Sequence, residues 1–366
     1  MELSQAEAGP PVRHCARIAI LGPAFEPALL FFADQVTRAF ARVGYGVIVE
    51  PRGLLRIASL LPSATEIVYA LGLGDELVAV THECDYPAEA ATHTHVTRSL
   101  LAADMSSAEI DRAVRRSARD AHTIYELDAD LLVGLAPEVV LTQSLCEVCA
   151  VPRAAVEEAV CSMPAGARVV SLDPHTVDGM LDSVIAAGDA LNASERAHRL
   201  VAGLRERIDT VRASVRGAAR PRVLCLEWLD PIYRGGHWVP EQVAIAGAED
   251  ALGRPGETST VLAWEEVVAY APEVLVVMPC GFDQEQAAAR LAELSKRPGW
   301  DELPAVREGR VFAVDGSAYF SRPGPRLIDG IELLAAIFHS NAAQSAPAGT
   351  EVLRLAANGS FEPFLR

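Results

Sequence analysis

The sequence predicts an α/β protein in which two α/β lobes are joined by one long helix. Short apolar runs alternate with helical patterns over residues 56–175 and again over residues 218–340. Between them, residues 176–217 carry almost no strand signal, and apolar side chains recur there at the three- and four-residue spacing of one helical face. Because strands that alternate with helices form sheets covered by helices, each outer segment is expected to build its own lobe.

The N-terminal lobe, residues 56–175, opens with a predicted buried strand at 56–61. Ser63 and Glu66 are three residues apart and form a capping-box pattern, so a helix is expected to start there and to end at Gly72. Leu131 to Leu135 reads as a helix. The remaining strands of this lobe are predicted at residues 77–81, 139–142 and 169–172.

The connecting helix, residues 176–217, places Leu204, Ile208 and Val211 on one face. Asn192 would interrupt it, but a single long helix is the simpler interpretation. The C-terminal lobe, residues 218–340, follows. Its strands are predicted at residues 222–227, 274–278 and 311–314, and its closing helix at about 325–339.

The two ends of the chain are set apart from the lobes. Residues 1–55 are predicted to be an N-terminal extension, βαβ-like, with strands at 16–22 and 45–50. Residues 341–366 form a predicted C-terminal tail, which is rich in small residues and proline at first and then strand-like at 351–355.

Composition excludes several classes of partner. Charged residues make up 22% of the 366 residues and the formal net charge is −17, so neither nucleic acid nor an acidic membrane surface is an expected partner. No run approaches the roughly 18 apolar residues of a membrane helix, so no membrane insertion is predicted. The seven cysteines are an odd number in a long chain, which is untypical of a secreted disulfide framework.

The cysteine count and the start of the chain together predict a cytoplasmic location. Glu2 and Glu7 precede the first apolar stretch, and Pro23 and Pro27 break it, unlike a signal peptide. The location would be periplasmic if an export signal has been missed.

Four polar clusters, each directly after an apolar run, are the main functional signal. They lie at residues 59–66, 81–87, 145–149 and 227–238. In open α/β sheets, ligands bind beyond the carboxyl ends of the strands. The clusters are therefore predicted to form the walls of one site.

The clusters contain two kinds of candidate residue: polar or metal-ligating side chains, and aromatic side chains. His82 or Cys84 is predicted to point into the site, with Glu83 or Asp85 orienting it, although a solvated turn before Pro87 would also explain this run. Trp228 and its aromatic neighbours surround Gly235-Gly236, where glycine would let the backbone approach a ligand closely. The predicted ligand-binding residues are Ser63, Thr65, His82, Glu83, Asp85, Tyr86, Trp228, Asp230, Tyr233, His237, Trp238 and Tyr319.

The Cys146-x-x-Cys149 pair suggests a metal or redox site, but two thiols packed in a helical turn would explain it equally well. A tetrahedral site needs two further ligands, which the other clusters would supply if the lobes meet. The predicted metal ligands are Cys84, Cys146, Cys149, His82 and His237. No nucleophile-elbow, P-loop or dinucleotide motif occurs, so no enzyme activity is predicted.

Several of these segments resemble the cobalamin and iron-siderophore substrate-binding proteins. Residues 56–66 and 71–81 are similar to the opening of that family, and residues 135–141 and 271–277 are similar to its repeated element, in which Pro-Asp/Glu precedes an apolar strand. The resemblance covers about residues 56–340, in the right order. The chain is most similar to a cobalamin-binding-protein-like subgroup that also carries segments like 81–87 and 145–149.

The resemblance implies a ligand cleft between the lobes and only modest hinge motion. It makes the chain a binding protein for a corrinoid, such as cobalamin, or a related metal chelate. The flat ligand would lie between residues 81–86 and 228–238, with His82 or His237 as an axial cobalt ligand. Such a protein would bind or carry its ligand rather than transform it.

Two alternatives remain at this point. The first is a cytosolic metal protein, redox-active in one version, that holds an iron–sulfur cluster or zinc with its cysteines and histidines. The second is the substrate-binding subunit of an ABC transporter, which would have a membrane permease as its partner.

Overall fold

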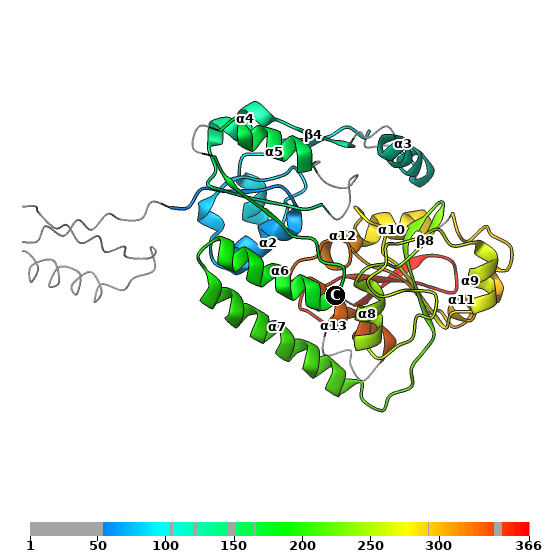
Figure 1. Cartoon of the computed structure of the whole chain (residues 1–366). Helices are drawn as coiled ribbons and strands as arrows, with labels where there is room; N and C mark the ends of the chain where they lie inside the picture. The colour runs from blue at the N-terminus through cyan, green and yellow to red at the C-terminus, as the bar shows by residue number, and fades with distance from the viewer. Residues whose placement is uncertain are drawn as a thin grey trace, which may run out of the picture. The chain divides into compact units, whose positions relative to one another are not determined.

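The computed structural model describes residues 54–102, 105–119, 123–144, 151, 153–163, 166–291, 293–339 and 346–365 (Figure 1). The chain separates into two compact units, Met1–Leu55 and Arg56–Arg366. The βαβ-like extension predicted within residues 1–55 lies outside the described residues. Both predicted lobes belong to the second unit.

The N-terminal lobe is built on a parallel four-stranded sheet with the strand order β2-β1-β5-β6. Its central strands are fully buried apolar runs, as expected for a parallel sheet covered on both faces. The strands are β1 (Ile57–Ser59), β2 (Leu77–Ala79), β5 (Val139–Thr142) and β6 (Arg168–Ser171). The helices are α2 (Pro62–Ala70), α4 (Ala129–Leu135) and α5 (Arg153–Cys161), with 3-10 turns η1 (Gly74–Glu76) and η2 (Ala88–Thr92).

Helix α2 starts differently from the predicted capping box. Its N-cap is Leu61, which makes no side-chain cap, and Pro62 occupies the first helical position, where its fixed φ and missing N–H are tolerated. Ser63 and Glu66 are therefore inside the helix, and Glu66 is available for a contact elsewhere.

A second, smaller layer of this lobe was not predicted from the sequence. Strands β3 (Thr97–Ser99) and β4 (Tyr125–Leu127) pair antiparallel, and helix α3 (Ser107–Arg119) lies between them in the chain. Ser106 and Glu109 form the capping box of α3: Ser106 donates from N and Oγ to Glu109 Oε2, at 2.8 and 2.7 Å.

The predicted single connecting helix is wrong, because two helices stand in its place. Helix α6 (Val177–Ala190) and helix α7 (Ser194–Ser214) are separated by Asn192, whose left-handed φ of 57° ends the first helix. The two pack side by side, and a Cβ on Gly188 would come within 2.3 Å of Ala197 Cβ. The predicted apolar face, including Leu204, Ile208 and Val211, is buried.

The C-terminal lobe holds a six-stranded sheet in the order β12-β11-β10-β9-β7-β8. Strands β7 (Val223–Leu229), β9 (Val274–Val277) and β10 (Val311–Ala313) are parallel, and β8 (Ile232–Arg234) returns antiparallel to β7. The helices are α8 (Val239–Ile245), α9 (Trp264–Tyr270), α10 (Gln284–Leu291), α11 (Pro304–Arg307), α12 (Gly316–Tyr319) and α13 (Leu327–Phe338), with the turn η3 (Trp300–Glu302).

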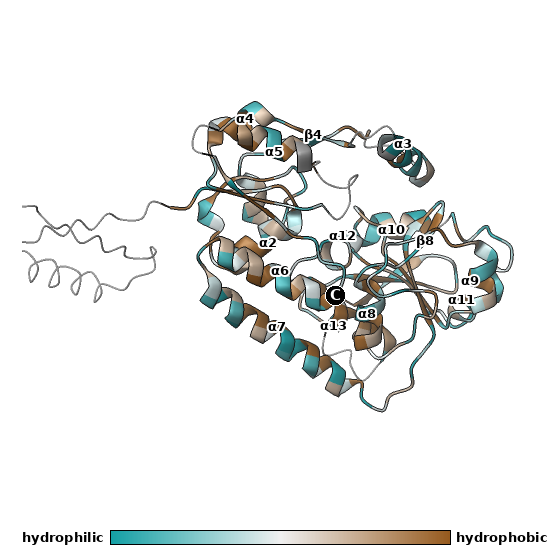
Figure 2. Ribbon diagram, in the orientation of Figure 1, coloured by the Kyte–Doolittle hydropathy of each residue, from teal (hydrophilic) through white to brown (hydrophobic). Residues whose placement is uncertain are grey.

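The C-terminal segment is part of this lobe rather than a separate tail. Strand β11 (Val352–Leu355) pairs antiparallel with β10, and β12 (Phe361–Leu365) pairs with β11. The predicted strand at 351–355 thus extends the sheet. Figure 2 shows that α13 is mostly hydrophobic, consistent with its burial, whereas α3 is largely hydrophilic.

Candidate ligand-binding site

The N-terminal lobe presents a pocket at the carboxyl ends of β1, β2 and β5. Within it, His82 Nδ1 lies 2.8 Å from Thr97 Oγ1, and the His82 ring packs on Tyr125 with ring centroids 5.3 Å apart. Tyr125 OH donates to Glu83 Oε1 at 2.8 Å. Burial lowers the pKa of His82, so its imidazole is neutral at physiological pH. The lining residues are Leu60, Leu61, Pro62, Thr81, His82, Glu83, Thr97, Tyr125, Gln143 and Val151.

Four of these residues lie outside the predicted clusters: Thr97, Tyr125, Gln143 and Val151. Gln143 directly follows strand β5, so the strand-end rule that selected the four clusters would have found it. Thr97 and Tyr125 belong to the β3–β4 pair, for which no strand had been predicted.

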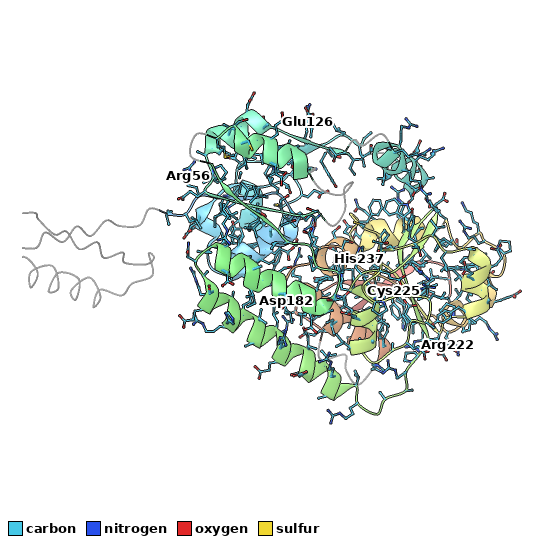
Figure 3. All side chains as sticks on the ribbon, viewed as in Figure 1. Arg56, Glu126, Asp182, Arg222, Cys225 and His237 are labelled. Atoms are coloured by element: carbon cyan, nitrogen blue, oxygen red, sulfur yellow. The ribbon has the colours of Figure 1, made fainter. Side chains whose placement is uncertain are left out.

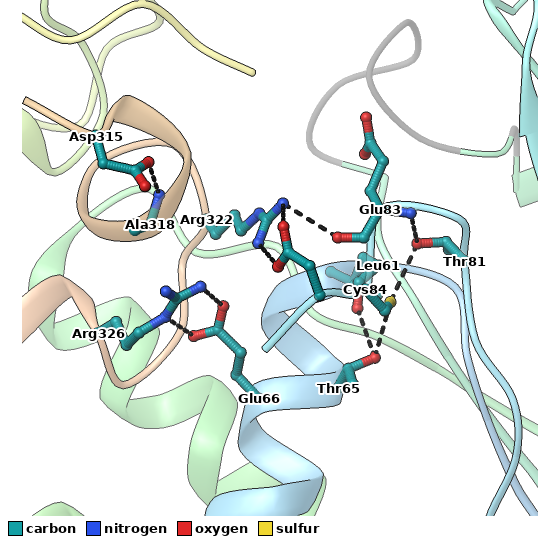
Figure 4. Close-up of polar contacts among 11 residues, drawn as sticks. Leu61, Thr65, Glu66, Thr81, Glu83, Cys84, Asp315, Ala318, Arg322 and Arg326 are labelled. Carbon is teal, nitrogen blue, oxygen red and sulfur yellow. Dashed lines mark hydrogen bonds and ion pairs between the residues drawn. The ribbon is translucent and has the colours of Figure 1, made fainter. Parts of the chain in front are cut away.

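A buried hydroxyl–thiol network surrounds Cys84 and includes Thr81, which lines this pocket. Thr65 Oγ1 donates to Ser59 Oγ at 2.8 Å. Cys84 Sγ lies 3.1 Å from both Thr65 Oγ1 and Thr81 Oγ1 (Figure 4). Thr65 is 0% and Cys84 2% exposed, and burial raises the pKa of the Cys84 thiol. The predictions that Thr65 contacts ligand and that Cys84 ligates a metal are therefore corrected: both are packed inside. Ser63, 3% exposed, is buried as well.

Two ion pairs join the lobes beside this pocket, and we call them the arginine bridge (Figure 4). Arg326 donates to both carboxylate oxygens of Glu66, at 2.6 and 3.1 Å, and its guanidinium lies 4.0 Å from the Tyr86 ring centroid. Arg322 pairs with Asp85 and also donates to Glu83 O at 3.1 Å. Asp85 and Tyr86, predicted to bind ligand, here contact arginines.

The arginine bridge contains charged groups that are buried in the protein interior. The side chains of Glu66 and Arg326 are 3% and 12% exposed. Burial raises the pKa of Glu66, and the hydrogen bonds from Arg326 act against that rise. Neither arginine was predicted from the sequence, because Arg322 and Arg326 lie about 240 to 260 residues from their partners and only the fold brings them together.

The C-terminal lobe contributes an aromatic wall. The Trp228 and Phe282 rings stack with centroids 5.6 Å apart and planes 21° apart, and the Arg290 guanidinium lies 4.9 Å from the Phe282 centroid. Trp228 Nε1 donates to Asp230 O at 3.1 Å. The predicted pair Trp228 and Tyr233 is partly exposed, as a ligand-contacting wall requires, and Asp230 lies beside it.

Helix α3 of the N-terminal lobe contacts this wall, and we call these contacts the α3 bridge. Tyr233 OH donates to Asp111 Oδ1 at 3.2 Å and accepts from Arg115 at 2.9 Å. Trp228 Nε1 also reaches Ser107 O, at 3.3 Å. Arg290 donates to Ser107 Oγ and Met105 O, both at 3.1 Å.

Glycine is required in the Gly235-Gly236 turn for chain packing, and the predicted close approach of a ligand is not the reason. A Cβ on Gly236 would come within 2.3 Å of the Ser259 backbone nitrogen, so glycine is needed for chain packing and not for the approach of a ligand. Trp238 is likewise removed from the predicted wall. It is 4% exposed, and its Nε1 donates to Phe320 O at 2.7 Å. Tyr319 is partly buried and packs edge-on to Phe320.

His237 remains a candidate ligand-binding residue. Its backbone is left-handed, with φ of 50°, and its Nε2 is buried without a hydrogen-bond partner within the described residues. Its ring packs 5.7 Å from that of His175, in the connection between β6 and α6. Figure 3 shows His237 in the C-terminal lobe, near the start of α6.

The predicted metal centre finds no support in the described part of the chain. Cys146 and Cys149 lie outside the described residues. Among the residues that are described, no group of three or more His, Cys, Asp or Glu side chains is arranged to hold a metal ion.

Comparison with known proteins identifies the family of this chain. A family model described as periplasmic binding protein matches residues 57–318. The chain belongs to this family. Members of the periplasmic binding protein family bind substrates and are not enzymes, in agreement with the prediction.

Two curated relatives cover most of the chain. An ABC transporter substrate-binding lipoprotein from Bacillus subtilis is 28% identical over 295 residues, which are 78% of this chain and 79% of the relative. A vitamin B12-binding protein from Vibrio cholerae is 24% identical over 289 residues, 78% of this chain and 90% of the relative.

Solved structures confirm the two-lobe α/β fold. A periplasmic heme-binding protein from Roseiflexus matches with a TM-score of 0.61 and 24% identity, covering 79% of this chain and all of that one. The periplasmic vitamin B12-binding protein of Vibrio cholerae matches with a TM-score of 0.56 and 21% identity, covering 79% and 97%.

The predicted cytoplasmic location is wrong. The family model describes periplasmic proteins and the Bacillus relative is a lipoprotein, so the comparisons point to an extracytoplasmic location. The prediction had relied on cysteine count and on the first residues, which weigh less than a match over 57–318. None of the described helices combines the length and apolar character needed to cross a bilayer.

Proposed function

We propose that this chain is the substrate-binding subunit of an ABC transporter for a planar metal chelate of the corrinoid or tetrapyrrole class. One flat face of the chelate would lie against Trp228, with Asp230 and Tyr233 at its edge. The opposite face would lie against the residues that line the His82 pocket. The observation that carries the proposal is the stacked Trp228–Phe282 wall on one lobe together with a polar, aromatic pocket on the other.

Physical chemistry favours a large, flat ligand for such a pair of surfaces. Stacked aromatic rings offer a broad apolar face, and their polar tips fix the edge of what binds. His82, Glu83 and Tyr125 form a connected polar set that can meet amide or carboxylate groups at the rim of a macrocycle. The family supports the same class, since relatives are named for vitamin B12 and structural neighbours for heme.

A membrane permease is the partner that this function requires. The Bacillus relative is named as an ABC transporter substrate-binding lipoprotein, and such subunits deliver their substrate to a permease. Pull-down of the chain by its candidate permease, with and without cyanocobalamin or hemin, would test this partnership.

Titration calorimetry with cyanocobalamin and with hemin tests the proposed ligand class. At least one of them should bind, and Trp228→Ala should weaken that binding about 30-fold or more, because truncating a buried aromatic at a binding surface costs about 2 kcal/mol or more. Trp228→Phe keeps a ring and should retain most of the affinity.

Val268→Ala, at an exposed side chain on α9, is the matched control and should bind like the unmodified chain. Absence of binding to either chelate would overturn the proposed ligand class. Equal affinity in the Trp228→Ala and Val268→Ala variants would remove the aromatic wall from the site.

A further inference from the structure

Helix α3 lies at the end of an arm that projects from the N-terminal lobe, and we call β3, α3 and β4 together the α3 arm. Its strands form a two-stranded sheet of their own, in register from Thr97↔Leu127 to Ser99↔Tyr125, apart from the four-stranded sheet. Figure 1 shows α3 beyond these strands, away from α4 and α5. A strand pair of this size is marginally stable by itself, so contacts at the two ends of the arm decide where it lies.

The base of the α3 arm forms part of the pocket in the N-terminal lobe. Thr97 Oγ1 lies 2.8 Å from His82 Nδ1 and accepts a hydrogen bond from His82 N at 3.1 Å. Tyr125 OH donates to Glu83 Oε1 at 2.8 Å, and the Tyr125 ring packs on that of His82. Thr97 belongs to β3 and Tyr125 to β4. A ligand that enters this pocket therefore meets the two strands that carry α3.

The tip of the arm, helix α3, engages the polar atoms of the aromatic wall. Tyr233 OH donates to Asp111 Oδ1 at 3.2 Å and accepts from Arg115 at 2.9 Å. Trp228 Nε1 donates to Ser107 O at 3.3 Å. The polar tips of aromatic side chains are the atoms with which such a wall fixes the edge of a ligand. A chelate bound at Trp228 and Tyr233 would therefore compete with α3 for these atoms.

Polar contacts hold α3 against the wall, and they can be exchanged for contacts with water. Among the described side chains of α3, only Ser107 is buried. Arg290 donates to Ser107 Oγ and to Met105 O, both at 3.1 Å. The Arg115 side chain is 46% exposed. Because water replaces exposed polar partners at little cost, α3 can leave the wall without opening an apolar core.

We propose that α3 is a lid over the aromatic wall and that a chelate displaces it on binding. This inference rests on the proposed function and adds a competitor from within the same chain. A site that is accessible only while its lid is open binds with an apparent Kd that rises as the open fraction falls. Weakening the contacts of α3 with the wall should therefore tighten chelate binding. If α3 instead contacted the ligand, the same change would loosen binding.

Asp111→Ala combined with Arg115→Ala is the variant that tests the lid. It removes both partners of the Tyr233 hydroxyl, leaves the net charge unchanged and alters no residue of the wall. Alanine favours helix, so α3 keeps its own structure. Titration calorimetry with cyanocobalamin and with hemin should give a Kd about threefold to tenfold lower, the range expected from loss of one or two exposed hydrogen bonds.

Glu195→Ala combined with Arg199→Ala is the matched control. It removes another exposed acid–arginine pair with the same four-residue spacing, on α7, and also leaves the net charge unchanged. Its Kd for either chelate should equal that of the unmodified chain.

Hydrogen exchange of the unmodified chain supplies a second readout. A saturating chelate should protect residues 81–87 and at the same time speed exchange in residues 107–119, because a 13-residue helix that has lost its tertiary contacts is marginally stable. In the Asp111→Ala, Arg115→Ala variant, exchange in α3 should already be fast before the chelate is added.

The outcomes separate the two proposals. If neither cyanocobalamin nor hemin binds the unmodified chain, the proposed function fails and the lid falls with it. If a chelate binds and the Asp111→Ala, Arg115→Ala variant has an unchanged or higher Kd, the function stands and the lid is wrong. Protection of residues 107–119 by the chelate would also overturn the lid, and would make α3 part of the binding site.

Discussion

The arginine bridge and the α3 bridge join the same two lobes by different physical means. In the arginine bridge, Arg326 forms a two-point ion pair with Glu66, and both side chains are largely removed from water. In the α3 bridge, the Tyr233 hydroxyl meets Arg115, whose side chain is 46% exposed.

This difference predicts where the lobes can separate. Removing one partner of a buried ion pair leaves an uncompensated charge inside, which is costly. Exposed charged contacts are worth little, since water replaces them. The arginine bridge should therefore hold the lobe arrangement, and the α3 bridge should open first. A chelate that reaches Trp228 would enter on the α3 side.

The largest expected effect comes from breaking the arginine bridge. Arg326→Ala should lower the free energy of unfolding by about 3–5 kcal/mol, because Glu66 stays buried without its partner. Chemical denaturation monitored by circular dichroism measures the loss. Combining Arg326→Met with Glu66→Gln should recover much of it, since the buried charge is then gone. A loss below about 1 kcal/mol in Arg326→Ala would contradict the assignment of this bridge as the main interlobe contact.

A much smaller effect on the free energy of unfolding is expected from a substitution in the α3 bridge. Tyr233→Phe removes the hydroxyl that contacts Asp111 and Arg115, and should cost about 1 kcal/mol or less. Hydrogen exchange of residues 107–119 should nevertheless become faster, because α3 loses a contact with the aromatic wall. Arg199→Ala, which breaks an exposed pair with Glu195 on α7, is the control and should leave α3 exchange unchanged. Unchanged exchange in Tyr233→Phe would mean that Tyr233 does not hold α3.

The smallest expected effect is a pH dependence that belongs to neither bridge. Burial lowers the pKa values of His82 and His237, so below the ordinary histidine pKa of 6.5 the unfolded chain binds more protons than the folded one. Their contribution to stability is complete above pH 6.5 and is lost as the pH falls through this value. The histidines should therefore lower the melting temperature between pH 7.5 and 5.5, while buried Asp250, whose pKa burial raises to about 6, acts in the opposite direction. His82→Gln combined with His237→Gln should remove the histidine contribution and leave a smaller fall or a larger rise over this range. An unchanged pH profile in this double variant would show that other groups cause it.

Local pattern was enough to predict the two α/β lobes and their buried parallel strands, but not β3, β4, β8 or β12. The runs at 57–59, 139–142 and 274–277 are continuous apolar segments between turns, and buried parallel strands have this composition. The break at Asn192 was harder to predict, because a single left-handed residue between two helical patterns is a weak signal. The Ser106–Glu109 capping box did mark the start of α3 and was overlooked.

The site was predicted less completely because burial and distant pairing are tertiary properties. Thr65, Cys84 and Trp238 stand in polar or aromatic clusters and still pack inside, since each finds a buried hydrogen-bond partner. Arg322 and Arg326 occur in an ordinary turn sequence and acquire a role only through residues of the other lobe. Trp228, by contrast, is partly exposed and stays a predicted ligand contact.

A planar chelate held in the proposed site would contact both lobes at once. Hydrogen exchange of the chain with and without saturating cyanocobalamin, and separately with hemin, tests this contact. We expect one chelate to protect residues 81–87 and residues 227–238 together. Protection confined to one lobe, or located away from both segments, would contradict it.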